Sequence, residues 1–166
     1  MDKKVLISYF IQKGKETSTS KKVAEDIAAA LKTKNVEYNE FAITPVESYP
    51  EDKVEFEGVV KLELKDRIRP AITSKVGKFT DYQTIVVVAP NWYGDAPMGV
   101  YTFFDEHDFG GKRIVPVICH AGDGGKEIRE SFRKFMKCDV LDGVDIAENS
   151  DDTAAVTEVV EEILAK

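Results

Sequence analysis

The chain has 166 residues, of which 43% are hydrophobic and 32% charged, a composition typical of a soluble globular protein with room for a buried core. Its 23 lysines and arginines against 30 aspartates and glutamates give a formal charge of −7, which argues against nucleic acid or an anionic membrane surface as the main partner. The two cysteines, Cys119 and Cys138, are too few for a disulfide framework and have no metal-ligand spacing.

The start of the chain leads directly into a short apolar run and lacks the features of a secretory signal peptide. No segment approaches the roughly 20 consecutive apolar residues that span a membrane. We therefore expect a cytoplasmic protein whose residues 1–166 form a single domain.

The first predicted unit is a buried strand over residues 5–10, a loop over 11–20 and a helix. Thr19 or Ser20 is a good candidate to cap that helix. The helix is predicted from an apolar stripe at helical spacing, formed by Val23, Ala24, Ile27, Ala28 and Leu31. Lys21 and Lys22 follow the loop, where a helix dipole disfavours cations, so either they face water or an anion binds there.

A second strand, nearer a sheet edge, is predicted over residues 36–43 and is followed by a proline-containing loop. Residues 51–66 fit a helix in part and a strand in part, and their charge density together with the need for a crossover favours the helix. Residues 67–81 form a long connection.

The central strand is predicted over residues 84–89, a continuous and mostly β-branched apolar run typical of a strand buried on both faces. Pro90 ends this run because it cannot donate to a sheet ladder. The aromatic pair Trp92 and Tyr93 follows at the carboxyl end, where ligands bind in open parallel sheets. The pair either stacks on a planar ligand or caps the core.

The second half of the chain repeats the alternation of strand and helix. Asp95 is placed to cap a helix whose first residue is Pro97, and a buried strand over 113–119 is interrupted by Pro116. The next helix buries Ile128, Phe132, Phe135 and Met136; it is followed by a last strand over 140–147 and by a final helix with the stripe Val156, Val159, Val160, Ile163 and Leu164.

This alternation predicts an α/β fold with a largely parallel sheet covered on both faces. The loops 11–20, 90–95 and 120–125 each leave the carboxyl end of a buried strand and are expected to converge on one edge. They offer hydroxyl groups before a helix, aromatic rings and exposed backbone, in that order. Together they predict a site for a phosphorylated planar ligand.

Several other kinds of site are excluded or left open. The glycine fingerprints of dinucleotide and nucleoside-triphosphate sites and the serine-hydrolase elbow are absent, and no aspartate ends the central strand as in a phosphate-accepting receiver domain. Residues 105–108 look like metal ligands or form a solvated helix end. His120 is either a proton donor beside a bound ring or an ordinary loop histidine.

The block from Pro90 to Met98, of the form P-x-W-x-G-D-x-P-M, resembles the flavodoxin family, closest to a bacterial branch of it. Residues 100–103, 108–112, 69–72 and the loop 120–125 are similar to the same branch. The resemblance implies a doubly wound five-stranded parallel sheet in the order 2-1-3-4-5, helices on both faces, and FMN at the switch point between strands one and three.

The resemblance also implies the cofactor contacts. The ring would lie against Pro90, Asn91, Trp92, Tyr93 and Gly94 and be covered by His120, Ala121, Gly122, Asp123 and Gly124; the phosphate would lie against Thr17, Ser18, Thr19 and Ser20. No residue need act as a covalent catalyst.

The first loop departs from the family pattern because it is several residues longer. Ser18 takes the usual glycine position and Gly14 lies too early to replace that glycine. The first hypothesis is an FMN-binding redox protein, monomeric or homodimeric, whose partner is a redox protein or a small quinone-like substrate. The alternatives are a flavodoxin-fold binding or scaffold protein that has lost tight FMN binding, and a protein for another phosphorylated ligand.

Overall fold

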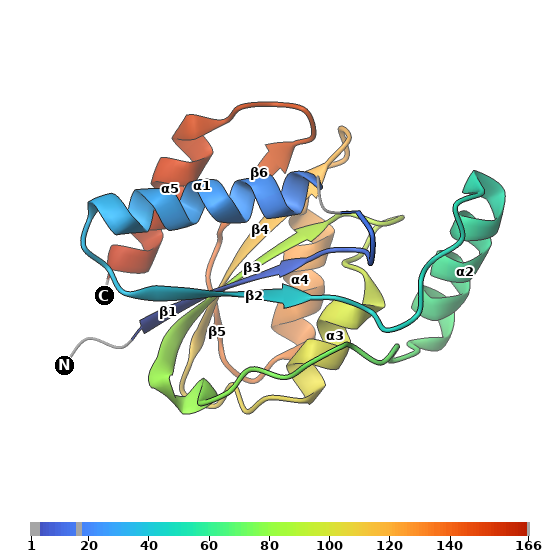
Figure 1. The fold of residues 1–166 in the computed structure, drawn as a ribbon, viewed down its shortest axis with the longest axis horizontal. Helices are drawn as coiled ribbons and strands as arrows, with labels where there is room; N and C mark the ends of the chain where they lie inside the picture. Colours follow the sequence, from blue (N-terminus) through green and yellow to red (C-terminus); the bar gives the residue numbers. More distant parts are fainter. Residues whose placement is uncertain (1–3, 16–17, 166) are drawn as a thin grey trace.

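The computed structural model describes residues 4–15 and 18–165 and contains one parallel sheet (Figure 1). The strand order β2-β1-β3-β4-β5, with β6 also beside β4, confirms the predicted doubly wound α/β fold. The strands are β1 (Lys4–Phe10), β2 (Tyr38–Ile43), β3 (Tyr82–Pro90), β4 (Arg113–His120), β5 (Asp139–Val140) and β6 (Val144–Ala147).

Strand β3 lies at the centre and is buried on both faces, as its uninterrupted apolar sequence predicts. Ile85 and Val87 belong to the cluster on one face, whereas Val86 and Val88 belong to the cluster on the other. All four side chains are fully buried. Because successive side chains of a strand point to opposite faces, this strand supports both halves of the core.

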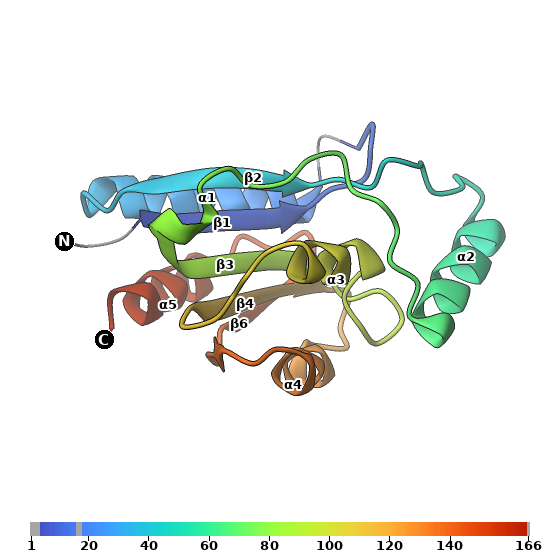
Figure 2. The same cartoon turned by 90° about the horizontal axis from the view of Figure 1, so that it is seen from below.

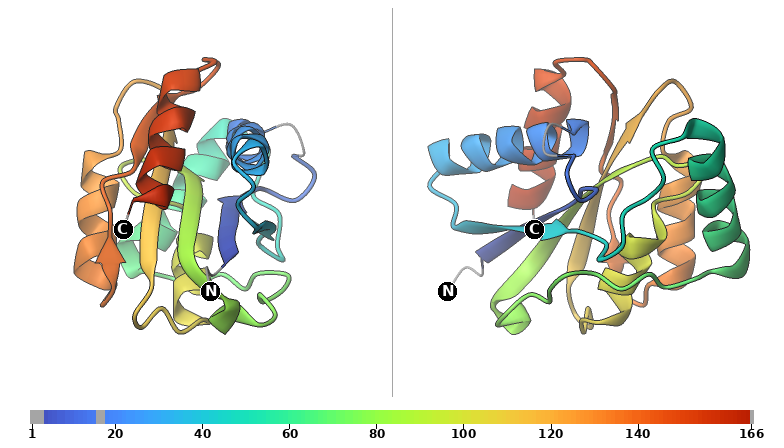
Figure 3. Two further views of the ribbon diagram at one scale, coloured as in Figure 1. Left: turned by 90° about the vertical axis from the view of Figure 1, so that its left-hand side faces the viewer. Right: turned by 45° about the vertical axis from the view of Figure 1, so that its right-hand side comes forward.

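Helices pack on each face of the sheet, seen from the amino ends of the strands in Figure 3, left. The helices are α1 (Thr19–Thr33), α2 (Lys53–Asp66), α3 (Met98–Asp105), α4 (Lys126–Phe135) and α5 (Thr153–Leu164), with a short 3₁₀ turn at Phe79–Asp81. The buried residues of α1 and α5 share one cluster, and those of α3 and α4 share the other. None of the helices in the described part of the chain combines the length and apolar character needed to cross a bilayer.

Helix α2 confirms the helical interpretation of the ambiguous segment, but it stands beyond the carboxyl ends of the strands (Figures 1 and 2). Val60 is its one fully buried residue in the described structure, whereas Val54 and Leu62 are 76% and 53% exposed. A helix that buries so narrow a stripe carries only a weak periodic signal, which explains the ambiguous sequence pattern.

The predicted last strand over residues 140–147 is wrong in one respect, because the structure divides it into β5 and β6. The break spans residues 141–143 and lies opposite Pro116, which pairs with Val87 on its other side. A Cβ atom at Gly143 would lie 1.7 Å from the Pro116 carbonyl oxygen. A close backbone crossing at glycine therefore accommodates the proline inside the sheet.

Candidate functional site

A cavity of about 280 Å³ lies where β1, β3, β4 and β6 end, next to the first turn of α1. Five predicted site residues line it: Ser18, Thr19, Ser20, Pro90 and Trp92. Six others were not named as cofactor contacts, although three of them belong to the predicted loop 11–20: Phe10, Ile11, Gln12, Lys15, Cys119 and Glu148. Phe10 ends β1, Cys119 is the next-to-last residue of β4 and Glu148 follows β6, so the rule that ligands bind at carboxyl ends could have identified them.

The first loop turns before it reaches the helix. The Lys15 amide donates to the Gln12 carbonyl oxygen at 3.0 Å, and Gly14 takes the left-handed conformation, with φ +82°, inside this turn. Such a conformation favours glycine. The turn brings Lys15, an exposed cation, to the wall of the cavity.

Helix α1 is capped by Ser18, so the predicted caps Thr19 and Ser20 are wrong by one and two residues. The Ser18 hydroxyl accepts a hydrogen bond from the Lys21 amide at 3.2 Å. Its backbone is extended, with φ −72° and ψ 154°, a conformation open to any residue. The serine at the usual glycine position is therefore unstrained. Thr17, also predicted in this loop, lies outside the described residues.

The floor of the cavity contains a buried thiol. Cys119 and Ser20, the latter in the first turn of α1, both line the cavity. Burial raises the pKa of Cys119 to about 11; the Ser20 hydroxyl lowers the pKa, and the Glu148 carboxylate raises it. The thiol therefore stays protonated at neutral pH.

Trp92 forms the aromatic wall of the cavity. Its ring meets those of Phe10, Tyr49 and Phe56 edge to face, with centroids 5.1, 5.1 and 4.9 Å away. Pairs of aromatic rings prefer the edge-to-face arrangement, so these three contacts hold the indole in place. Trp92 therefore caps the core, which was one of the two interpretations of the aromatic pair, and it also lines the cavity.

Tyr93 is placed differently, at the tip of a tight turn between Trp92 and Asp95. The Trp92 amide donates to the Asp95 carbonyl oxygen at 2.8 Å, and Tyr93 and Gly94 both have positive φ, 55° and 100°. Tyr93 is 44% exposed, and the Lys61 ammonium lies 5.4 Å from the centroid of its ring. A non-glycine residue at positive φ is strained, and surrounding contacts must hold it there.

The loops after β3 and β4 meet through Asn91. Its side-chain amide donates to the Gly124 carbonyl oxygen at 2.8 Å, and its side-chain oxygen accepts from the Gly94 amide at 2.9 Å. In the second loop, the Gly122 amide donates to Nδ1 of His120 at 2.9 Å, so a neutral ring carries its proton on Nε2. Asn91, Tyr93 and Gly94 thus stand beside the cavity rather than in its wall.

The other residues predicted in the second loop also stand beside the cavity rather than in its wall: His120, Ala121, Gly122, Asp123 and Gly124. Ala121, Gly122 and Asp123 are exposed. They present backbone at the same edge of the sheet as the aromatic loop.

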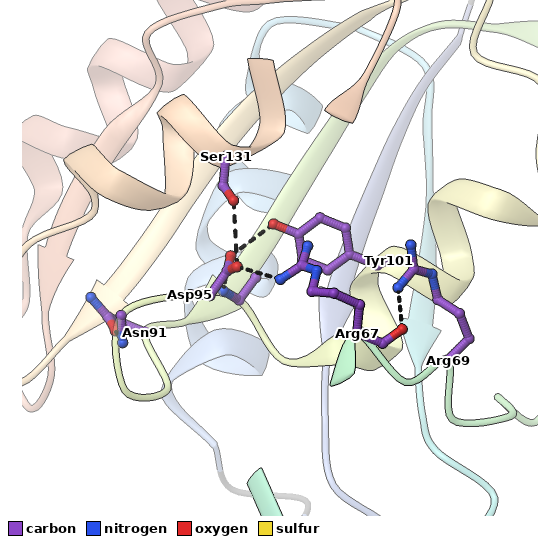
Figure 4. A network of polar contacts seen from close by, with 8 residues as sticks. Arg67, Arg69, Asn91, Asp95, Tyr101 and Ser131 are labelled. Atoms are coloured by element: carbon purple, nitrogen blue, oxygen red, sulfur yellow. Dashed lines mark hydrogen bonds and ion pairs between the residues drawn. The ribbon is translucent and has the colours of Figure 1, made fainter. Parts of the chain in front are cut away.

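Asp95 does not cap α3 as predicted. The helix begins at Met98 with Pro97 as its cap, and Asp95 is instead the centre of a polar network (Figure 4). One of its carboxylate oxygens accepts from the Tyr101 hydroxyl at 2.7 Å, and the other accepts from Arg67 at 2.9 Å and from Ser131 at 3.4 Å.

This network joins the turn at Tyr93 to three helices. Arg67 is the C-cap of α2, and Tyr101 and Ser131 come from α3 and α4. Burial, together with the Asp95 charge, raises the pKa of Tyr101 well above its ordinary value, so its hydroxyl remains a donor.

The segment 105–108 forms the end of α3, whose C-cap is Glu106. The Val76 amide donates to Nε2 of His107 at 2.9 Å, and Nδ1 donates to the Phe103 carbonyl oxygen at 2.8 Å. Both ring nitrogens are therefore used within the protein. Asp105 pairs with Arg69 at 2.6 Å.

The family model described as flavodoxin matches residues 4–163. Among solved structures, a candidate flavoprotein from Bacteroides eggerthii is 23% identical with a TM-score of 0.78, over 99% of this chain and all of its own. A flavoprotein in complex with FMN from Lactobacillus acidophilus is 18% identical with a TM-score of 0.69, over 94% of this chain and 99% of its own. A flavodoxin from the Archaea is 16% identical with a TM-score of 0.55, over 95% and 92% of the two chains. A comparison with curated proteins gave no match.

The solved structures support the fold, and the family model supports membership along almost the entire sequence. The cavity agrees with both, because it lies at the carboxyl ends of β1 and β3, the switch point of a sheet with this order. The chain belongs to the flavodoxin family.

Proposed function

We propose that the protein binds FMN at this cavity and acts as a redox protein. The observation that carries the proposal is that the cavity beside α1 adjoins the loops 90–95 and 120–125, which the Asn91–Gly124 hydrogen bond connects. One end suits a phosphate and the other a flat ring, which are the two ends of FMN.

The residues present fit the cofactor at both ends. The hydroxyl groups of Ser18, Thr19 and Ser20 lie at a helix N-terminus, where the dipole and the amides favour an anion, and Lys15 adds a positive charge. The rings of Trp92 and Tyr93 and the backbone of 120–124 offer surfaces to the isoalloxazine. The cofactor supplies the electron chemistry, and the protein sets its potential through contacts and charge.

The decisive experiment is an FMN titration of the flavin-stripped protein, followed by quenching of flavin fluorescence, with riboflavin as the control. Saturable FMN binding tighter than that of riboflavin supports the proposal. An absence of saturable binding at high micromolar FMN contradicts it and leaves the alternative of a flavodoxin-fold scaffold.

The loaded protein then allows a test of the partner class, either a redox protein or a small quinone-like substrate. In the fold, reductases that take small substrates often pair over the flavin, whereas electron carriers leave the flavin edge exposed. Gel filtration that shows a homodimer supports a reductase, and a monomer supports a carrier.

A further inference from the structure

The cavity contains one cation and one anion among the described residues that line it, Lys15 and Glu148. Lys15 comes from the loop after β1, and Glu148 directly follows β6, with β3 and β4 between those strands in the sheet. The two charged residues therefore reach the cavity from different strands of the sheet. The Glu148 amide donates to the His120 carbonyl oxygen at 2.7 Å, which fixes the backbone of this residue.

The charge of Glu148 acts at the floor of the cavity. Its carboxylate contributes to the raised pKa of the Cys119 thiol, and Cys119 lines the same cavity as Ser20 in the first turn of α1. Glu148 thus lies near the same turn that would hold a phosphate.

The two lysines near the start of α1 do not offset this charge from within the cavity. Lys22 forms ion pairs with Asp26 at 3.1 Å and with Asp151 at 3.5 Å. The charge of Lys21 lowers the pKa of Glu40 in β2. Neither lysine lines the cavity. Lys15 is therefore the cation that a bound anion would meet first.

We propose that Lys15 and Glu148 together set how much negative charge the cavity accepts, Lys15 favouring a phosphorylated ligand and Glu148 opposing it. The inference rests on the proposed function. Both side chains line the same cavity of about 280 Å³, so a phosphate bound there is expected to interact with both charges. A phosphate monoester carries about −1.5 to −2 charges at pH 7, so both interactions are felt strongly.

The consequence is a small preference for FMN over riboflavin, because the favourable and the unfavourable charge partly cancel. In Glu148→Gln, we expect FMN to bind at least about threefold more tightly while riboflavin changes less than twofold. In Lys15→Gln, we expect FMN to bind at least about threefold more weakly, again without a change for riboflavin. Higher salt should reduce both effects.

The experiment measures the Kd of FMN and of riboflavin for the wild type, both variants and Glu161→Gln. Glu161 is an exposed residue of α5 outside the cavity, so this control removes the same charge elsewhere. A change that is equal for both flavins would show a packing effect and overturn the inference, as would no change in Glu148→Gln or the same change in the control.

The results also separate this inference from the proposed function. If the wild type binds neither flavin but Glu148→Gln binds FMN, the inference holds and FMN binding by the natural chain fails. If no variant binds FMN, both fail.

Discussion

Removal of the Asp95 carboxylate is expected to cost far more stability than removal of a surface carboxylate in an ion pair of the same length. The Arg67–Asp95 and Arg133–Asp142 pairs have N···O distances of 2.9 and 2.8 Å. The Asp95 side chain is 15% exposed, whereas that of Asp142 is 90% exposed. Distance alone would therefore rank the two pairs equally, and burial separates them.

The magnitude follows from the groups that Asp95→Ala leaves without a partner. The Tyr101 hydroxyl and the Ala96 amide both donate to Asp95, and both residues are fully buried. An unsatisfied buried polar group costs about 1–3 kcal/mol, whereas Arg67 is partly exposed and can turn to water. We expect a loss of about 2–4 kcal/mol in the free energy of unfolding.

Asp95→Asn is the graded variant, because its carbonyl oxygen still accepts from Tyr101 and Ala96 while its amide faces the Arg67 guanidinium. We expect it to lose about 1–2 kcal/mol. Asp142→Ala should change stability by less than about 0.5 kcal/mol, since its partner and its own position are solvated.

Urea denaturation followed by far-UV circular dichroism measures the free energy of unfolding of the wild type and of all three variants. For a chain of this size, the expected loss in Asp95→Ala lowers the Tm by about 4–16 °C. A loss below about 1 kcal/mol, or an equal loss in Asp142→Ala, would show that burial does not decide the strength of this network.

Three further substitutions test other parts of the structure. Trp92→Ala should weaken FMN binding at least about tenfold, because the cavity loses its aromatic wall, and an unchanged Kd in fluorescence titration would place the ring elsewhere. Gly143→Ala should lower the free energy of unfolding measured in urea by more than about 2 kcal/mol, because its Cβ would overlap Pro116. Gly111 also has positive φ but would have nothing within 4 Å of its Cβ, so Gly111→Ala should lower it by only about 1 kcal/mol. Equal losses in the two variants would exclude the overlap. Burial raises the pKa of Glu63 above 4.5, so ionisation of its carboxyl opposes folding and the wild type loses stability as the pH rises through that pKa. Glu63→Gln should avoid this loss and become more stable relative to the wild type between pH 4 and pH 7. Urea melts in which the variant instead becomes less stable relative to the wild type over this range would contradict the sign.

The strand and loop positions were predictable because they depend on local patterns and on one topological rule. The apolar run of β3 predicted its burial on both faces, and the order of the sheet then placed the loops after β1, β3 and β4 at one edge. The contact between Asn91 and Gly124 is a consequence of that convergence.

The role of Asp95 was not predictable from its neighbours. An aspartate two residues before a proline is a strong local signal for a helix cap. The charge of Arg67, 28 residues earlier, and the hydroxyl of Tyr101 compete for the same carboxylate. Tertiary contacts override the local preference because they satisfy buried groups, whereas the amides at the start of a helix can also be solvated.

The lengthened first loop shows why comparison of motifs alone misjudges this site. The missing glycine suggested a damaged phosphate loop, yet Ser18 adopts an extended backbone that requires no glycine, and the left-handed turn has moved to Gly14. The turn at Gly14 brings Lys15 to the cavity, which Glu148 also lines. At Ser18, the backbone conformation therefore places no barrier to an anion, and under our proposal the balance of the Lys15 and Glu148 charges decides how tightly an anion binds.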